Sequence, residues 1–409
     1  SSEQMIYIVN HAEDKVIFVD LTFVPILAAL KDHLPKDLIY VAMTDRKHMP
    51  DTDIVNLLCY EDLMEAETTD FDWPEFDENT ACGLCYTSGT TGNPKGALYS
   101  HRSTVLHAMM GVISLQTCLR PGKRILPVVP LFHVNAWGLP YAAPLSGASL
   151  IFPGAALDGP SLHKLMEDER VFSAWGVPTV WMGLLSEIKA KGGKPSSFKE
   201  VIIGGSAAPR PMIEAFENMD VSVAHAWGMT EMSPIGTVGV LNLEQENLPL
   251  SERIDLKAKQ GRRVFGVDLK IVDEDGNRMP HDGVAQGELY VRGNAVVSAY
   301  FKNEEASKTS IDADGWFGTG DVAKIEPNGM LTITDRAKDL IKSGGEWISS
   351  IDVENMAMAH ESVANCAVIA IPDPKWDERP LLIVVPAQGA DRDAISILES
   401  LSKSLAKWQ

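Results

Sequence analysis

The most informative stretch of this sequence is Tyr86-Thr-Ser-Gly-Thr-Thr-Gly-Asn-Pro-Lys-Gly96. It follows an apolar run and precedes a segment with a helical pattern. Its small residues allow backbone N–H groups to surround a phosphate, its hydroxyl groups add donors, and Lys95 adds a positive charge. We interpret the stretch as a phosphate-binding loop. The alternative, a flexible turn rich in glycine and threonine, explains fewer of its positions.

This loop differs from the phosphate-binding loop of the P-loop NTPases. In those proteins the lysine is followed by a serine or threonine that binds Mg²⁺. Here Gly96 follows Lys95, and Pro94 precedes it. The sequence therefore predicts a phosphate site of another class.

On both sides of the loop, short apolar runs alternate with helical patterns. Strands are expected at Leu38–Ala42, Arg124–Val129, Ala148–Phe152 and Val201–Ile203, and helices at Ser103–Leu115, Gly159–Glu169 and Pro211–Asn218. Alternation of this kind predicts βαβ units and parallel sheets, and hence an α/β fold.

The pattern changes near Val264. Strands are then expected at Phe265–Val272, Gly287–Arg292 and Met330–Thr334, a strand at Ala367–Ile371, and a helix at Ala394–Lys407. We expect a large N-terminal domain over 1–334 with a β-rich subdomain at about 264–334, and a small, mobile α+β C-terminal domain over 335–409. Because the chain opens on Ser1 without an initiator sequence, we expect its beginning to be missing.

Composition excludes several classes of protein. The 409 residues carry a formal net charge of −20, which argues against a nucleic-acid partner because such proteins need a basic face. The five cysteines are odd in number and sparse, which fits a reducing compartment and predicts a cytoplasmic protein. The pair Cys82 and Cys85 has metal-site spacing, but no second pair follows it. No apolar run reaches the roughly 20 residues that span a bilayer.

Four further motifs follow the loop along the chain. They are Gly204-Gly-Ser-Ala-Ala-Pro209, Ala226-Trp-Gly-Met-Thr-Glu231, Gly315-Trp-Phe-Gly-Thr-Gly-Asp321, and Thr334-Asp-Arg-Ala-Lys-Asp339 with the adjoining Ile341-Lys-Ser-Gly-Gly-Glu346. With the loop, and in this order, they resemble the adenylate-forming superfamily of acyl-CoA synthetases, luciferases and peptide-synthetase adenylation domains. The resemblance covers nearly the whole chain.

The resemblance implies a site for ATP and Mg²⁺. The implied catalytic residues are Thr87, Thr90, Lys95, Thr230 and Glu231, and Glu231 and Thr87 are the implied metal ligands. The implied nucleotide-binding residues are Ser88, Gly89, Thr91, Gly92, Gly205, Ser206, Ala207, Ala208, Pro209, Ala226, Trp227, Gly228, Asp321 and Arg336. Carboxylate oxygen suits a hard cation such as Mg²⁺, an indole face suits adenine, and a carboxylate accepts from ribose hydroxyls. Read alone, Trp227 would be an ordinary core residue as often as a ligand-binding one, and Asp321 and Arg336 would more often be surface charges.

The resemblance also implies a reaction in two steps. A carboxylate attacks the α-phosphorus of ATP to give an acyl-adenylate and pyrophosphate, and the thiol of coenzyme A then displaces AMP. The small domain rotates between the steps about a hinge that Asp335 matches. The implied border of the coenzyme A channel is formed by Lys342, Gly344, Gly345, Glu346 and Trp347.

The acid is expected to bind near Leu131-Phe-His-Val-Asn-Ala-Trp-Gly138, which resembles the acyl pocket of fatty-acyl-CoA synthetases. The substrate residues implied are His133, Trp137, Val177, Gly204 and Met229. Bulky aromatic side chains shorten a pocket, so we expect a short- or medium-chain acid. The runs Pro130–Ala143, Ala226–Ser233, Ser343–Ile351 and Lys375–Pro380 resemble medium-chain fatty-acyl-CoA ligases and 3-methylmercaptopropionate-CoA ligases.

One element of the family pattern is not matched. Its adenylation lysine lies in a Gly-Lys motif near the C-terminus, and this sequence stops at Gln409 before such a motif. Two alternatives stay open. One is a luciferase-like oxygenase on the same fold, and the other, prompted by the unmatched lysine, is a non-catalytic nucleotide-binding protein. Members of the family are often homodimers, and the expected partners are otherwise a carboxylic acid, ATP and coenzyme A.

Overall fold

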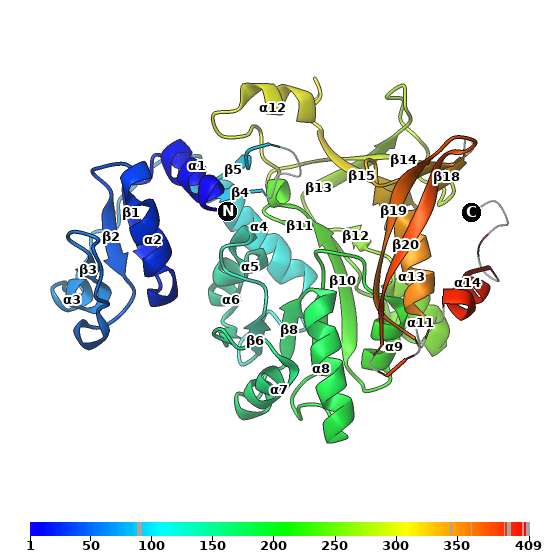
Figure 1. Cartoon of the computed structure of the whole chain (residues 1–409), viewed down its shortest axis with the longest axis horizontal. Coiled ribbons are helices and arrows are strands. Elements are labelled where there is room, and N and C mark those ends of the chain that lie inside the picture. Colours follow the sequence, from blue (N-terminus) through cyan, green and yellow to red (C-terminus); the bar gives the residue numbers. More distant parts are fainter. Residues whose placement is uncertain are drawn as a thin grey trace.

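The computed structural model describes residues 1–87, 92–343, 346–360, 362–387, 389–390, 394–402 and 405, with the backbone alone at 346 and 347. An N-terminal unit forms its own small core around Val24, Leu27 and Leu30. It comprises α1 (Ser2–Ala12), β1 (Val16–Val19), α2 (Val24–Leu30), β2 (Ile39–Ala42), β3 (Leu58–Cys59) and α3 (Tyr60–Glu65), with 3-10 turns at Leu21–Phe23, Lys31–His33 and Arg46–His48. Its three strands are parallel, and the unit stands apart at the left of the molecule (Figure 1).

A sheet of eleven strands forms the centre of the molecule, in the order β13-β14-β15-β16-β12-β11-β10-β9-β8-β6-β7. The strands are β6 (Arg124–Pro127), β7 (Ser149–Leu150), β8 (Ser173–Gly176), β9 (Glu200–Ile203), β10 (Ser222–Gly228), β11 (Ile235–Val238), β12 (Gly261–Arg263), β13 (Val267–Val272), β14 (Gln286–Gly293), β15 (Phe317–Ile325) and β16 (Met330–Arg336). Strands β6 to β10 pair in parallel and the rest antiparallel. The α/β fold class is confirmed.

The β-rich region after Val264 continues this sheet. The sequence suggested a subdomain beside the parallel part, because its strands are joined by turns instead of helices. In the structure β10 pairs with β9 on one edge and with β11 on the other, so the hydrogen-bonded ladder runs through both parts. The antiparallel strands thereby bring the segment 317–336 next to β10.

Helices cover both faces of the parallel part (Figure 1). They include α4 (His101–Ser114), α5 (Val134–Trp137), α6 (Leu139–Ser146), α7 (Gly159–Asp168), α8 (Pro178–Lys191), α9 (Arg210–Glu217) and α11 (Leu250–Lys257). The short helix α10 (Leu243–Glu246) precedes α11 in the sequence, and α12 (Glu304–Ser310) contacts β15 in the antiparallel part. Along β9, Ile202 enters the core cluster that also holds residues of α4 and α6, while Val201 and Ile203 enter the cluster with α7, α8 and α9. Burial on both faces explains why this strand reads as a continuous apolar run.

The phosphate loop connects the two strands of a hairpin, β4 (Ala81–Tyr86) and β5 (Gly96–Ser100). Tyr86 pairs with Gly96, and the Thr87 N–H donates to the Lys95 carbonyl at 2.9 Å. The helix expected from Ser103 begins at His101, because Ser100 and Ser103 form a capping box at that point.

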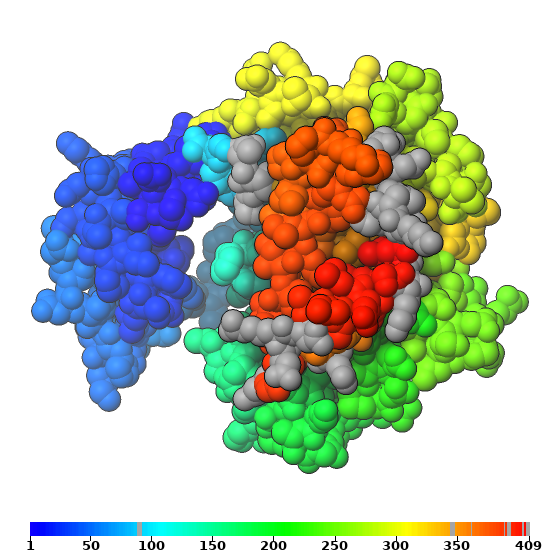
Figure 2. Space-filling view, turned by 45° about the vertical axis from the view of Figure 1, so that its right-hand side comes forward, coloured from blue at the N-terminus to red at the C-terminus, as the bar shows by residue number. Residues whose placement is uncertain are grey.

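The C-terminal unit has a sheet in the order β18-β17-β20-β19 and two helices. Its elements are β17 (Ile341–Ser343), β18 (Glu346–Ile348), α13 (Ser350–Met358), β19 (Val363–Asp373), β20 (Asp377–Pro386) and α14 (Ala394–Ser402). The expected strand at 367–371 lies within the longer β19, and β20 was not anticipated. The expected helix from Ala394 is described as far as Ser402. Figure 2 shows this unit, in orange and red, lying across the front of the molecule.

The proposed domain boundary falls inside a strand. β16 runs through Asp335 to Arg336, and a turn at 337–339 follows. The Asp335 carboxylate accepts hydrogen bonds from the Ser350 N–H at 2.6 Å and the Ser350 hydroxyl at 3.1 Å. The last strand of the sheet is thus tied to α13, while the boundary itself stays a prediction. In the described parts of the chain, no helix has the length and apolarity needed to cross a bilayer.

Candidate active site

A cleft of about 610 Å³ opens where the parallel strands end. Gly204 and Gly205 follow β9, and Gly228 is the last residue of β10. The cleft is lined by Thr87, Lys95, His133, Val134, Trp137, Gly204, Gly205, Ala226, Trp227, Gly228, Met229, Thr230, Glu231, Pro234, Ile235, Tyr300, Ser310, Phe317, Gly318, Thr319, Gly320, Arg336, Ala337 and Lys338. Ligands of α/β proteins bind at this edge of the sheet, outside the carboxyl ends of the strands.

Lys95 brings a positive charge to the cleft from the end of the phosphate loop. Its side chain is half-buried, and the ammonium nitrogen lies 5.0 Å above the centre of the Tyr300 ring. In the part of the chain that the structure describes, no carboxylate pairs with it. Its charge is therefore available to a phosphate.

Glu231 is the buried acid of the cleft. It sits in a 3-10 turn, Thr230–Met232, and is 6% exposed. The Tyr300 hydroxyl donates to Glu231 Oε1 at 2.5 Å, and the Tyr99 hydroxyl donates to the Thr230 carbonyl at 2.6 Å. Burial raises the pKa of both tyrosine hydroxyls, so both are donors at neutral pH.

The donor set suits Mg²⁺ that is carried in on a nucleotide. Among the described residues no three acidic, histidine or cysteine side chains gather around a metal position. Mg²⁺ is commonly held by one or two carboxylates together with substrate phosphates and water, so one buried glutamate beside a phosphate loop is sufficient. Glu231 fits this role, and Thr87, which also lines the cleft, offers a hydroxyl.

Trp227, Asp321 and Arg336 form a second polar group, from β10, β15 and β16. The Trp227 indole N–H donates to Asp321 Oδ2 at 2.9 Å, and Arg336 Nε lies 3.1 Å from Asp321 Oδ1. Burial raises the pKa of the Asp321 carboxyl, and the Arg336 charge opposes that shift. Gly236 leaves room for the indole, because a Cβ there would lie 2.8 Å from Trp227 Cζ3.

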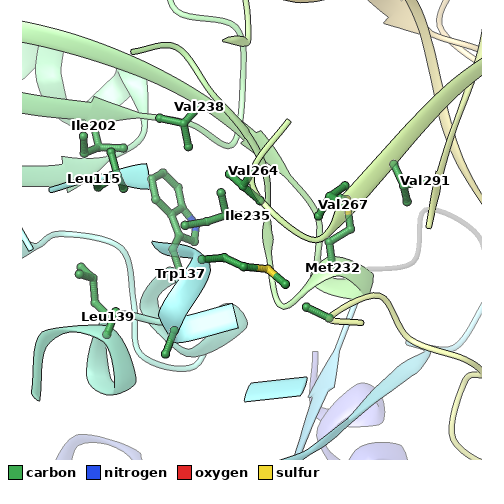
Figure 3. Packing of buried hydrophobic residues seen from close by; sticks show 14 of the residues in the cluster. Leu115, Trp137, Leu139, Ile202, Met232, Ile235, Val238, Val264, Val267 and Val291 are labelled. Atoms are coloured by element: carbon green, nitrogen blue, oxygen red, sulfur yellow. The ribbon is translucent and has the colours of Figure 1, made fainter. Parts of the chain in front are cut away.

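The expected acyl segment has an unusual backbone. Residues 134 to 138 all have positive φ, with values of 49°, 52°, 45°, 57° and 79°. A left-handed turn costs roughly 1–2 kcal/mol for each non-glycine residue, so tertiary contacts must hold it. The turn directs the Trp137 ring toward Gly204, where a Cβ would lie 3.0 Å from Trp137 Cη2. Figure 3 shows Trp137 among Ile202, Ile235 and Leu139.

Among the expected site residues that the structure describes, most lie at the same cleft. Its lining includes Thr87, Lys95, Thr230, Glu231, Gly205, Ala226, Trp227, Gly228, Arg336, His133, Trp137, Gly204 and Met229. Asp321 reaches the cleft through Trp227 and Arg336, and Val177 Cγ1 lies 3.1 Å from where a Cβ of Gly205 would be. Outside the lining are Gly92, Ser206, Ala207, Ala208, Pro209 and Lys342. Ser88, Gly89, Thr90, Thr91, Gly344, Gly345 and the side chains of Glu346 and Trp347 lie outside the described residues.

Sequence reasoning missed several lining residues. Phe317, Gly318 and Lys338 lie within motifs already singled out, so their neighbours in sequence could have indicated them. Tyr300 lies in none of the motifs. It reaches the cleft through a contact with Glu231 across 69 positions of sequence, for which no local signal exists.

Two known protein families match this chain. The AMP-binding enzyme family matches residues 1–301, and the AMP-binding enzyme C-terminal domain matches residues 352–408. The chain is 50% identical to 3-methylmercaptopropionyl-CoA ligase of Ruegeria lacuscaerulensis, over 100% of this chain and 75% of that protein. It is 48% identical to medium-chain-fatty-acid–CoA ligase of Ectopseudomonas oleovorans, over 100% of this chain and 74% of that protein.

Solved structures share the fold at lower identity. The anthranilate CoA ligase AuaEII in complex with anthranoyl-AMP has a TM-score of 0.88 and 24% identity, over 100% of this chain and 75% of that one. ATP-bound MatB of Rhodopseudomonas palustris has a TM-score of 0.80 and 22% identity, over 100% of this chain and 76% of that one. These matches confirm the arrangement of the large sheet and the small C-terminal unit.

Proposed function

Because this chain belongs to the AMP-binding enzyme family and is an ATP-dependent acyl-CoA ligase, we propose that its acid is of short or medium length, with 3-methylmercaptopropionate the first candidate. The enzyme uses ATP, Mg²⁺ and coenzyme A, and it releases AMP as the acyl group passes to the thiol. The observation that supports the choice of acid is the Trp137 ring, which packs on Gly204 at the wall of the cleft. A bulky ring at this position limits the length of an acyl chain.

In the first half-reaction the substrate carboxylate attacks the α-phosphorus of ATP. Negative charge on the phosphates must be neutralised as the bond to pyrophosphate breaks. Lys95 and Thr87 serve this purpose from the phosphate loop, and Glu231 holds Mg²⁺, which neutralises phosphate charge when bound. Thr230 contacts the α-phosphate, and Thr90 belongs to the same set by position in the loop.

The nucleoside is held on the other side of the cleft. Trp227 offers its ring to adenine between Ala226 and Gly228. Asp321 accepts from the ribose hydroxyls, and Arg336 fixes the orientation of that carboxylate. The loop after β9, with Gly205 and Ser206, completes the adenine site.

In the second half-reaction the thiol of coenzyme A attacks the acyl carbon of the adenylate. We propose that the C-terminal unit moves between the two steps, with its pivot at the end of β16, so that Lys342 and the segment 344–347 border the path of the thiol. His133 and Met229 form the wall next to the acyl carbon.

We also propose that the protein is located in the cytoplasm and forms a homodimer. Sedimentation of the purified protein tests the dimer.

The experiment that tests this function is AMP release with MgATP and a panel of acids, with and without coenzyme A. The panel contains 3-methylmercaptopropionate, butyrate, hexanoate, octanoate and palmitate. We expect an acyl-CoA product that requires both acid and coenzyme A, with palmitate the poorest acid. A clear preference for palmitate would contradict the proposed acid. ATP binding without AMP release from any acid would contradict the ligase assignment.

A further inference from the structure

Tyr300 is anchored to the strand that follows the phosphate loop. It is 6% exposed, and in the sequence it lies between β14 and α12. It forms an antiparallel bridge with Ala97, and the N–H of the next residue, Phe301, donates to the Gly96 carbonyl at 2.8 Å. The Tyr300 N–H donates to the Ser307 hydroxyl at 2.9 Å. The backbone at Tyr300 therefore has a fixed position relative to Lys95, the residue before Gly96.

The Tyr300 side chain contacts both charged groups of the phosphate end of the cleft. Its hydroxyl donates to Glu231 Oε1 at 2.5 Å, and its ring carries the Lys95 ammonium 5.0 Å from its centre. The Phe317 ring packs edge-on against it, with centroids 6.2 Å apart. The ring is thus held from a third direction.

The two carboxylate oxygens of Glu231 have different surroundings. Oε1 takes the hydrogen bond from Tyr300, and within the described residues no donor reaches Oε2. A carboxylate held by one oxygen presents the other in a fixed direction, which suits a metal with strict geometry such as Mg²⁺.

Tyr300 contacts two opposite charges, those of Lys95 and Glu231. In the described part of the chain, Lys95 and Glu231 form no ion pair, although both line the same cleft. The face of an aromatic ring attracts an ammonium group without cancelling its charge. Lys95 therefore keeps a defined place before the nucleotide arrives.

We propose that Tyr300 is a positioning residue that aims Glu231 at the metal and holds Lys95 apart from it. The inference rests on the proposed role of Glu231 and Lys95 in handling MgATP. It goes beyond that role because Tyr300 itself carries neither the charge nor the metal, and acts through two other side chains. It places the metal affinity of the site under the control of one phenol hydroxyl.

The test is Tyr300→Phe, which keeps the ring, the backbone bonds and the Lys95 contact but removes the hydroxyl. Two quantities are measured: the Mg²⁺ concentration that half-saturates ATP binding at equilibrium, and kcat and KM for AMP release as Mg²⁺ is varied. We expect the half-saturating Mg²⁺ to rise about 10- to 100-fold, the range expected when a charged group loses a buried hydrogen bond. At saturating Mg²⁺ most of kcat should return.

Tyr60→Phe is the matched control. Tyr60 also packs edge-on against a phenylalanine, Phe18, but it lies in the N-terminal unit, so its Mg²⁺ dependence should equal that of the wild type. The double variant Tyr300→Phe with Glu231→Gln tests whether the effect passes through the acid. It should bind Mg²⁺ no more weakly than Glu231→Gln alone, since coupled residues do not add.

The outcomes separate this inference from the function on which it rests. An active wild type with an unchanged Mg²⁺ dependence in Tyr300→Phe overturns the positioning role alone. A wild type that neither binds MgATP nor releases AMP overturns the proposed function. If Tyr300→Phe does not fold, Glu231→Asp replaces it, because the shorter acid withdraws from the hydroxyl. An unchanged Mg²⁺ dependence in Glu231→Asp would again overturn the inference.

Discussion

Asp321 is held from two sides by residues that are distant in sequence. Trp227 occupies one carboxylate oxygen and Arg336 the other, from two different strands. In our proposal the indole of Trp227 thus has two uses: its face stacks on adenine, and its N–H orients the acid that we assign to ribose. Sequence reasoning foresaw the stacking face and not the hydrogen bond.

Trp227→Phe should separate those two uses. The ring face remains, but Asp321 loses a buried donor, which costs about 1.5–3 kcal/mol for a bond to a charged group. We expect ATP affinity to fall roughly 10- to 100-fold, and the loss to be much smaller for 2′-deoxy-ATP and 3′-deoxy-ATP, measured by equilibrium titration. Trp376→Phe, in the C-terminal hairpin, is the control. An equal loss for all three nucleotides would mean that the N–H does not act through the ribose.

Gly228→Ala tests the close approach at the end of β10. A Cβ at this position would overlap the Pro234 carbonyl, where β10 and β11 shift register. We expect the free energy of unfolding to fall by about 1–3 kcal/mol, the usual cost of overpacking, and ATP binding to weaken. Gly193→Ala is the control, because nothing lies within 4 Å of its Cβ position. Equal melting temperatures for the two variants would contradict the prediction.

At the scale of elements, β16 and α13 are joined by side-chain hydrogen bonds at the proposed boundary. The Ser350 backbone and hydroxyl donate to Asp335, and the Ser349 hydroxyl donates to the Thr334 carbonyl at 2.6 Å. These bonds hold the C-terminal unit in the arrangement that the structure shows. A movement of that unit between half-reactions would have to break them.

Ser350→Ala removes one of these bonds without changing the helix cap. We expect the amides of α13 to exchange with solvent faster, by the amount that corresponds to about 1 kcal/mol for one hydrogen bond. Hydrogen exchange followed by mass spectrometry measures it. Ser402→Ala in α14 is the control, since that hydroxyl donates only within its own helix. Exchange in β9 should stay as in the wild type.

The same contact predicts a dependence of stability on pH. Burial raises the pKa of the Asp335 carboxyl above its usual 3.8, against the hydrogen bonds from Ser350. The folded state therefore holds this proton more tightly than the unfolded state. Its contribution to the free energy of unfolding is complete below pH 3.8 and is lost as the pH rises through the raised pKa.

Asp335→Asn should accordingly flatten part of the fall in unfolding free energy as the pH rises from 3.8, measured by chemical denaturation across that range. Asp373→Asn is a control of opposite sign, because backbone hydrogen bonds lower the pKa of that carboxyl. Its stabilising contribution is present above the usual pKa and disappears as the pH falls. Identical pH profiles for Asp335→Asn and the wild type would contradict the sign worked out here.

At the scale of the whole molecule, one continuous sheet joins the residues that we assign to the nucleoside. β10 carries Trp227, while β15 and β16 carry Asp321 and Arg336, and the antiparallel ladder connects them. The N-terminal unit has a separate core and a separate sheet. Among the described residues, those that line the cleft include none from that unit.

Saturating MgATP should protect the two parts differently. At about 100 times its Kd a ligand adds about 2.7 kcal/mol to the unfolding free energy of the unit that binds it. We expect slower hydrogen exchange in β10, β15 and β16, and no change in β1 and β2. Protection of the N-terminal strands to the same degree would show that the two cores unfold together.

The phosphate loop, the other motifs and their order were sufficient to identify the family and most cleft residues. Each motif is a short contiguous segment, so its chemistry can be read directly from the sequence. Lys95, Glu231, Trp227 and Asp321 were found in that way. The alternation of apolar runs likewise predicted the parallel strands, whose burial on both faces leaves a plain pattern. The tertiary structure alone decided the continuation of the sheet through β11, the left-handed turn at Val134–Trp137 and the place of Tyr300 between Lys95 and Glu231. Each of these depends on contacts between residues far apart in sequence. The residue pattern of a short segment does not reveal the energy of such contacts.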